Sequence, residues 1–221
     1  MKPSVNINFN GRRVLVTGAG GGIGRACVDR FQSAGAVVVA TDLSNDLLAD
    51  YPLGSGAGHV VGCYACDLSS ESEVDSLLKA IAVDAGYPEI IAHCAGLIAY
   101  ATGVETVSAE AWDRLMAVNL RSAFLLCRGA IGAMKRAEFG RLVLLTSLAA
   151  QVGGIEVGAH YAASKAGLQG LVKTLAKEGA PSGVTVNLVA PGIIATGPVL
   201  AQVSDHIDRY AETIPLGRLG A

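Results

Sequence analysis

Residues 17–24, with the sequence TGAGGGIG, follow directly on the apolar run Arg13–Thr17 (RVLVT). A short continuous apolar run of this kind is typical of a strand that is buried on both faces. Beyond the glycines, Ile23, Cys27 and Phe31 recur every four residues, which is helical spacing. This part of the chain therefore predicts a strand, a tight glycine turn and a helix.

The same alternation of apolar strands and helical patterns continues along the chain, which indicates βαβ units and a parallel sheet. Right-handed crossovers would place helices on both faces of that sheet. We therefore expect a doubly wound α/β fold, a Rossmann-like three-layer sandwich, as a single domain over residues 1–221. The predicted strands are residues 13–17, 36–41, 60–66, 89–94, 141–147 and 184–189, and the later predicted helices are residues 70–83, 108–134 and 159–178.

Two helix starts carry capping signals. Ser70 and Glu73 have the S-x-x-E spacing of a capping box, and Ser108 precedes the long helical pattern that runs toward Met134. From Pro191 onward we expect loop and a short helix. There, Leu200, Val203, Ile207 and Tyr210 have near-helical spacing, which suits either a lid over a substrate or a core-packing helix.

The composition excludes some classes of partner. The chain has a net charge of −2 and no basic run or stripe, so nothing indicates binding to nucleic acid or to an anionic membrane. The longest apolar stretch, around residues 142–150, is too short to span a bilayer. The expected partner is a small molecule.

The cysteines are odd in number, and no signal peptide precedes them, which favours reduced thiols in the cytoplasm. Three of them, Cys27, Cys94 and Cys127, lie in apolar runs. Cys63 and Cys66 form one C-x-x-C, but no second ligand pair follows, so we interpret them as part of a buried strand and expect no metal site.

The glycine turn has the spacing T-G-x-x-x-G-x-G, with Gly18, Gly22 and Gly24 in register. Glycines let a backbone approach a pyrophosphate, and the following helix N-terminus offers free N–H groups. Asp42 ends the second predicted strand, where a carboxylate binds the ribose hydroxyls of a dinucleotide and repels a 2′-phosphate. The alternative interpretations are that the glycines form an ordinary turn without a ligand and that Asp42 is a solvated aspartate at a strand end.

Tyr161 and Lys165 form Tyr-x-x-x-Lys on a predicted helix, so both side chains share one face. An ammonium group near a phenol lowers the phenol pKa, which suits proton transfer to or from an oxygen atom. Ser147 ends the fifth predicted strand, at the edge where doubly wound sheets bind ligands. Asn119 lies inside the long predicted helix. The alternative interpretation is that it is simply a polar residue that the helix tolerates.

This combination resembles the short-chain dehydrogenase/reductase family. Each piece is weak alone, but together they lie in the family's order and span nearly the whole chain. The matching pieces are residues 17–24, Asp42, Asp67-Leu68, Asn119, Ser147, residues 161–165 (YAASK), and Pro191-Gly192 with Thr196.

The resemblance implies a catalytic set. Tyr161 would be the general acid and base, Lys165 would lower its pKa and hold the nicotinamide ribose, and Ser147 would bind the substrate oxygen. Asn119 would hold a water molecule in a proton relay that leads to Lys165.

The resemblance also implies a dinucleotide site. Ile23 would offer its amide to the pyrophosphate, Asp67 and Leu68 would hold the adenine, and Ile194 and Thr196 would hold the carboxamide and the neighbouring phosphate. The full implied set is Gly18, Gly22, Ile23, Gly24, Asp42, Leu43, Asp67, Leu68, Ala95, Gly96, Tyr161, Lys165, Pro191, Gly192, Ile194 and Thr196.

Relatives that prefer NADPH often carry a basic residue in the glycine loop or just after the second strand. Those places hold Gly21 and Asp42 here, which favours NAD(H) over NADP. The implied protein is a cytoplasmic NAD(H)-dependent oxidoreductase that interconverts a secondary alcohol and a ketone. It is most similar to 3-oxoacyl-carrier-protein reductases and to relatives acting on sugars, diols or hydroxyacids, and it is expected to be a homo-oligomer, a dimer or tetramer.

Two departures from the family stand out. His93-Cys94-Ala95-Gly96 occupies the place of the common Asn-Asn-Ala-Gly, and we expect His93 to be a structural substitute rather than a catalyst. After residues 214–221 (IPLGRLGA) the family normally continues with one more helix and a seventh strand, so the expected domain lacks both.

Two other functions stay open at this point. A nucleotide-binding sensor or scaffold without catalysis is favoured by the short C-terminus, but has no need of the complete catalytic set. Sugar-nucleotide epimerase or dehydratase chemistry is disfavoured, because the chain after Pro191 is too short for the larger substrate domain of those proteins.

Overall fold

The structure is a computed structural model that describes residues 7–101, 103–154, 157–203 and 207–221. Within these residues, six parallel strands form one sheet in the order β3-β2-β1-β4-β5-β6, which confirms the doubly wound sheet expected from the sequence. The chain reverses its winding direction between β1 and β4, and ligands bind at such a switch point. The strands are β1 (Arg13–Thr17), β2 (Val37–Asp42), β3 (His59–Ala65), β4 (Ile90–His93), β5 (Gly140–Leu145) and β6 (Val184–Val189).

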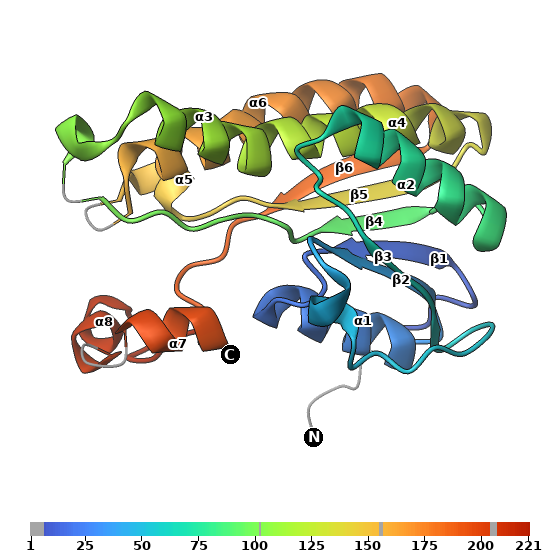
Figure 1. The fold of residues 1–221 in the computed structure, drawn as a ribbon, viewed down its shortest axis with the longest axis horizontal. Coiled ribbons are helices and arrows are strands. Elements are labelled where there is room, and N and C mark those ends of the chain that lie inside the picture. The colour runs from blue at the N-terminus through green and yellow to red at the C-terminus, as the bar shows by residue number, and fades with distance from the viewer. Residues whose placement is uncertain (1–6, 102, 155–156, 204–206) are drawn as a thin grey trace.

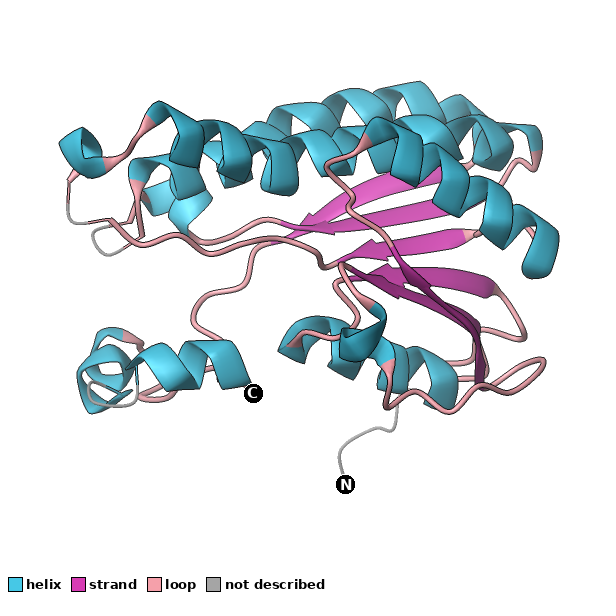
Figure 2. Cartoon of the chain, in the orientation of Figure 1, coloured by secondary structure: helices cyan, strands magenta, loops and turns pink. Residues whose placement is uncertain are grey.

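Helices cover both faces of the sheet, as Figures 1 and 2 show. In Figure 1, α2, α4 and α6 lie on one face and α1 lies on the other, while α7 and α8 lie beyond the carboxyl ends of the strands. The α-helices are α1 (Gly22–Ser33), α2 (Glu71–Asp84), α3 (Ala109–Met116), α4 (Ser122–Arg136), α5 (Ala149–Val152), α6 (Ala159–Gly179), α7 (Gly197–Val203) and α8 (Ile207–Thr213). The shorter turns are η1 (Asn45–Leu48), η2 (Val104–Thr106), η3 (Ala117–Arg121) and η4 (Ala180–Ser182).

Each face of the sheet has its own hydrophobic core. Successive side chains of a strand point to opposite faces, so Leu15 packs in the core under α2, α4 and α6, while Val14 and Val16 pack in the core beside α1. All three side chains are fully buried. The predicted continuous apolar run is therefore explained by two cores that share one strand.

The long predicted helix is present, but its middle is a π-helical turn. Ser108 caps it, since its Oγ accepts a hydrogen bond from the amide of Ala111 at 3.1 Å. The path then runs through α3, the π-turn η3 and α4. In the described part of the chain, the whole helix Ala109–Arg136 is long and apolar enough to cross a membrane by length and composition, and half of its apolar 18-residue window is buried. Its buried residues pack in the core.

Three local expectations differ from the structure. β5 ends at Leu145, so Ser147 lies two residues beyond the strand, next to the unpredicted short helix α5. β3 ends at Ala65, so Asp67 also lies in a loop. Ser70 caps α2, but the Glu73 carboxylate accepts from the amide of Asp67 at 2.8 Å instead of completing the capping box.

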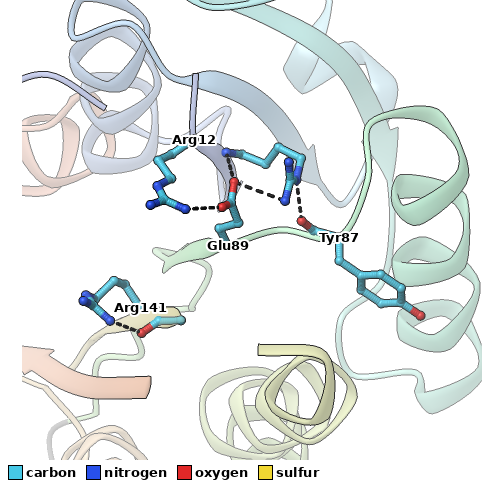
Figure 3. A network of polar contacts seen from close by, with 6 residues as sticks. Arg12, Tyr87, Glu89 and Arg141 are labelled. Atoms are coloured by element: carbon cyan, nitrogen blue, oxygen red, sulfur yellow. Dashed lines mark hydrogen bonds and ion pairs between the residues drawn. The ribbon is translucent and has the colours of Figure 1, made fainter. Parts of the chain in front are cut away.

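A polar network holds the amino ends of β1 and β4 together, at the edge opposite the glycine turn (Figure 3). The Glu89 carboxylate pairs with both Arg12 and Arg13 and accepts from the amide of Arg13 at 3.0 Å. Burial works to raise the pKa of Glu89, but these hydrogen bonds and charges outweigh it and hold the pKa below its usual value. Arg13 also donates to the carbonyl oxygen of Tyr87 at 2.8 Å.

The segment after β6 is anchored by the end of the chain. Ile194 and Gly220 form a parallel bridge, in which Ala195 donates to the carbonyl of Gly220 at 2.8 Å. Gly220 in turn donates to the carbonyl of Ile193 at 2.9 Å. This short pairing fixes the backbone that leads into α7.

The structure describes only part of residues 198–213, which the sequence suggests are a lid or a core-packing helix. They form α7 and α8, with residues 204–206 outside the described part of the chain. Leu200 is exposed, whereas Ile207 and Tyr210 are half-buried. A lid remains a prediction.

Candidate active site

The glycine turn between β1 and α1 is a bare backbone surface. Gly18 has a φ of +63°, in the left-handed region, and a Cβ there would lie 2.7 Å from the amide nitrogen of Ala95. A Cβ on Gly24 would lie 1.9 Å from the carbonyl oxygen of Gly18. Helix α1 begins at Gly22 without a side-chain cap, which leaves its first amides, including that of Ile23, for an anion. The turn therefore fits a pyrophosphate.

Asp42 ends β2 and joins the glycine turn. Its Oδ2 accepts from the amide of Gly20 at 2.8 Å, and its Oδ1 accepts from the amide of Leu43 at 2.7 Å. Each carboxylate oxygen has a further lone pair for an incoming hydroxyl. The carboxylate is thus held at the position where the sequence predicts the adenosine ribose.

Ser147 and Tyr161 come together from different elements. Ser147 lies in the loop between β5 and α5, and Tyr161 lies in the first turn of α6 with 8% of its surface exposed. Burial raises the pKa of Tyr161, and a hydrogen bond with the Ser147 side chain works against that shift. The two hydroxyl groups can therefore meet one substrate oxygen.

Lys165 lies one turn after Tyr161 and is 5% exposed. Its Nζ donates to the carbonyl oxygen of Leu145 at 2.9 Å. Burial lowers the pKa of Lys165 to about 8, although the nearby Cys94 sulfur works to raise it. The expected lowering of the Tyr161 pKa is not found: that pKa is raised, because burial dominates and the ammonium group is directed to the main chain of β5.

Asn119 is fully buried in the π-turn η3. Its Oδ1 accepts from the amide of Leu97 at 2.7 Å, while its Nδ2 donates to the carbonyl of Leu97 and to Ser164 Oγ, both at 3.0 Å. A π-turn shifts the local hydrogen-bond register and is frequent at functional sites. The side chain therefore connects the loop after β4 to α6.

The loop after β4 packs closely against Lys165 and Asn119. A Cβ on Gly96 would lie 3.0 Å from Lys165 Nζ and 3.2 Å from Asn119 Oδ1. Gly96 therefore allows the loop to approach both polar side chains. Of the predicted residues, Ala95 contacts the glycine turn and Gly96 contacts the catalytic set, so this loop joins the two halves of the site.

The segment after β6 also reaches the glycine turn. A Cβ on Gly22 would lie 2.5 Å from Thr196 Cγ2, so the two residues are in contact. The carbonyl oxygen of Pro191 accepts from the amide of Leu148 at 3.0 Å. Gly192 is exposed, and a Cβ there would meet open space, so packing does not explain this glycine.

The predicted adenine contacts lie at the same edge of the sheet. Asp67 Oδ1 accepts from both the amide and the hydroxyl of Ser69, at 2.9 and 2.7 Å. Leu68 is buried in the core, so only its backbone can face a ligand. Contacts of these two residues with adenine remain predictions.

A model of the family described as short chain dehydrogenase matches residues 12–206. The chain belongs to the short-chain dehydrogenase family. It is therefore an oxidoreductase.

Several relatives of known name align along most of the chain. The 3-oxoacyl-[acyl-carrier-protein] reductase FabG of Escherichia coli is 34% identical over 217 residues, which are 97% of this chain and 86% of that protein. The D-beta-hydroxybutyrate dehydrogenase of Cupriavidus necator is 32% identical over 209 residues, covering 94% and 80%. Among solved structures, one described as an NAD(P)-dependent gluconate 5-dehydrogenase from Beutenbergia cavernae, with bound NADP at low occupancy, has a TM-score of 0.84, 34% identity and coverage of 96% and 85%.

His93 stands where the short-chain dehydrogenases commonly have asparagine, and it lies in a buried hydrogen-bond chain. Its Nδ1 lies 2.8 Å from Thr17 Oγ1, and its Nε2 lies 3.4 Å from Ser122 Oγ. Ser122 donates to the carbonyl of Val118, so its oxygen can accept from Nε2–H, and Thr17 can then donate to Nδ1. Burial lowers the pKa of His93 to about 3, which keeps the ring neutral. His93, at the end of β4, thus links β1 to the first residue of α4.

Sequence reasoning did not find the partners of these side chains. Thr17, Ser122 and Ser164 are fully buried polar residues that hold His93 or Asn119 in place. The sequence does hold a signal for them: polar residues on otherwise apolar strand and helix faces indicate buried hydroxyl groups, and buried hydroxyl groups need hydrogen-bond partners.

Replacing Gly24 with alanine is expected to destabilise the fold by about 1–3 kcal/mol and to weaken NADH binding, because the added methyl group overlaps the carbonyl oxygen of Gly18. Urea unfolding and a nicotinamide fluorescence titration measure the two effects. Gly21→Ala is the matched control, since its Cβ would lie at an ordinary 3.4 Å from the same oxygen. Equal stability of the two variants would contradict this account of the turn.

Lys165 makes stability depend on pH. Its pKa is about 8 when folded and near 10.5 when unfolded, so between these values the unfolded chain binds more protons and stability rises with pH. Relative to Lys165→Met, the wild-type protein should gain at most about 3 kcal/mol of unfolding free energy from pH 8 to 10.5.

Urea unfolding of both proteins across that pH range tests this expectation. Lys173→Met is the control, because Lys173 is exposed on the same helix. A wild-type stability that runs parallel to that of Lys165→Met would show that Lys165 is not held in a desolvated site.

Proposed function

We propose that this oxidoreductase interconverts a secondary alcohol and a ketone with NAD(H), and that Tyr161 handles the proton. The observation that carries the proposal is the hydroxyl pair formed by the half-buried Ser147 and the buried Tyr161, with the buried Lys165 one helical turn after Tyr161. A buried, paired set of titratable groups at the carboxyl edge of a sheet is typical of a catalytic site.

The chain's residues fit a dinucleotide. Gly18 and Gly24 leave no room for side chains at the turn, the first turn of α1 lacks a side-chain cap, and Asp42 holds a carboxylate beside them. When bound, the nicotinamide would supply or accept the hydride. Ile194 and Thr196 would hold the carboxamide and the neighbouring phosphate of the dinucleotide.

In the reductive direction, Tyr161 would donate its hydroxyl proton to the substrate oxygen, while Ser147 orients that oxygen. Lys165 has a pKa of about 8, so it is mostly protonated at pH 7. Its ammonium group donates to the Leu145 carbonyl in this structure, so it would have to turn toward Tyr161 to stabilise the phenolate that Tyr161 leaves behind. Asn119 would hold the relay that returns a proton toward Lys165.

NAD(H) is the preferred dinucleotide in this proposal. A 2′-phosphate would approach the Asp42 carboxylate, and like charges brought together in a site cost several kcal/mol. The bound NADP of the gluconate 5-dehydrogenase structure concerns that protein. Asp42 is the residue of this chain on which the preference rests.

The proposed substrates are 3-oxoacyl or 3-hydroxyacyl compounds. The two relatives named above, a 3-oxoacyl-[acyl-carrier-protein] reductase and a D-beta-hydroxybutyrate dehydrogenase, are both named for compounds that carry an oxygen on carbon 3. We further propose a cytoplasmic homo-oligomer, a dimer or tetramer. Exposed aromatic side chains on the α3–α4 helix, Trp112 and Phe124, support association with a second copy.

Tyr161→Phe is expected to lower turnover of acetoacetate or an acetoacetyl thioester by about 10²–10⁴-fold, because the proton donor is lost. NADH binding should survive, as measured by nicotinamide fluorescence. Tyr87→Phe is the control, since Tyr87 is exposed at the opposite edge of the sheet. Unchanged turnover in Tyr161→Phe would remove Tyr161 from the mechanism.

Asp42→Asn is expected to reduce the preference for NADH over NADPH by about tenfold or more, because the repelling charge is removed while an acceptor oxygen remains. Parallel titrations with the two dinucleotides give the ratio of Kd values. Asp46→Asn controls for general surface charge, as Asp46 is exposed on the neighbouring turn η1. Tighter binding of NADPH than NADH by the wild-type protein would overturn the assignment.

A further inference from the structure

Two cysteines from distant parts of the sequence touch beside the glycine turn. Cys27 lies in α1 and Cys94 directly follows β4. The Cys94 thiol donates a hydrogen bond to Cys27 Sγ, with the two sulfur atoms 3.9 Å apart. Both side chains are half-buried and pack against the core beside α1. Neither cysteine belongs to the proposed catalytic set.

The two thiols differ in acidity. The hydrogen bond from Cys94 lowers the pKa of Cys27 to about 7, although burial works to raise it. The same contact, together with burial, raises the pKa of Cys94. Cys27 is therefore partly a thiolate at neutral pH, which is the form that reacts with oxidants, and Cys94 keeps its proton beside it.

The pair lies within the backbone contacts that shape the dinucleotide turn. The amide of Cys94 donates to the carbonyl of Thr17 at 3.2 Å, and a Cβ on Gly18 would lie 2.9 Å from the carbonyl carbon of Cys94. Cys27 lies one helical turn after Ile23, on the helix whose first amides face the proposed pyrophosphate. A movement of either cysteine backbone therefore presses on this turn.

We propose that Cys27 and Cys94 are a redox-active dithiol whose oxidation to a disulfide weakens dinucleotide binding at the glycine turn. The proposal rests on the proposed function for the identity of the ligand. The sulfur atoms would have to approach from 3.9 Å to about 2 Å, which draws α1 and the end of β4 together.

The oxidant is a hydroperoxide, such as hydrogen peroxide. The Cys27 thiolate attacks one peroxide oxygen, the O–O bond breaks, and the released hydroxide takes up a proton to form water. The Cys94 sulfur then attacks the sulfenic sulfur of Cys27, loses its proton and releases a second water molecule. The two sulfurs together lose two electrons, and the peroxide gains them.

Disulfide formation and dinucleotide binding weaken each other's equilibrium constants by the same factor. If the disulfide weakens NADH binding, NADH must make the disulfide harder to form to an equal extent, because the two equilibria are linked. We expect this factor to be about tenfold, within the usual range for coupled sites. Saturating NADH should therefore slow or reduce disulfide formation.

Peptide mapping identifies the disulfide without any ligand. The reduced chain is treated with hydrogen peroxide, the remaining thiols are alkylated, and trypsin digests it without reductant. Cleavage after lysine and arginine places Cys27 in peptide 26–30, Cys94 in peptide 80–114 and Cys127 in peptide 122–128, while Cys63 and Cys66 share peptide 31–79. A linked peptide 26–30/80–114 is the expected result, and its absence would overturn the proposal.

The binding arm compares NADH titrations of the reduced and oxidised chain. Oxidation should weaken binding about tenfold in the wild-type protein, and dithiothreitol should restore it. Cys27→Ala and Cys94→Ala should bind NADH equally before and after oxidation. Cys63→Ala, which removes another half-buried thiol from the same core, should respond as the wild type does.

The outcomes separate this proposal from the proposed function. A linked peptide with unchanged NADH affinity would show that the disulfide does not act on the turn, and would overturn the coupling. A reduced chain that binds neither NADH nor NADPH would contradict the proposed function, whereas the peptide map still reports on the dithiol. An oxidation response that persists in Cys27→Ala would assign the effect to another thiol and overturn the proposal.

Discussion

The close approach of backbone to backbone at the glycine turn is the constraint on which the rest of the structure depends. Gly24 lies against the carbonyl oxygen of Gly18, Gly18 lies against Ala95, and Gly22 lies against Thr196, at distances that no side chain could occupy. The glycine turn, the loop after β4 and the segment after β6 are distant in sequence, and they can come together only because the turn presents glycines without side chains. The position of α1, and with it the direction of its free amides, follows from these contacts.

Beside the glycine turn, the catalytic half consists of buried polar groups whose partners are main-chain atoms and buried hydroxyl groups. Lys165 donates to Leu145, Asn119 bonds both ways with Leu97, and His93 bridges Thr17 and Ser122. Fully satisfied buried networks of this kind fix one arrangement, since any displaced member would leave an unpaired polar group in a medium of low polarity. The site is thus rigid because its polar groups have few alternative partners.

The sequence was sufficient for the sheet, the helices on both faces and the positions of most site residues, because strand and helix periodicities are local properties. Asp42 lies at the end of β2 beside the glycine turn, and Tyr161 lies on α6 one turn before Lys165, as their spacing predicts, while their roles stay predictions. Ser147 was assigned to a strand that ends earlier: Leu145 is the last residue paired in register with β6, and the amide of Thr146 makes the last hydrogen bond to that strand, at 2.9 Å to the carbonyl of Val189. The partners of Asn119 and of His93 come from elements that are distant in sequence, and no local periodicity encodes such contacts.

The contact between Gly22 and Thr196 joins the beginning of the domain to a segment that follows its last strand. During synthesis, the first strand and its glycine turn leave the ribosome long before the chain that completes them. A ligand that binds only the finished site stabilises only the finished chain. Until the C-terminal part arrives, the early βα units leave apolar strand edges without their neighbours, and long-range pairings of this kind generally form slowly and expose a chain to aggregation.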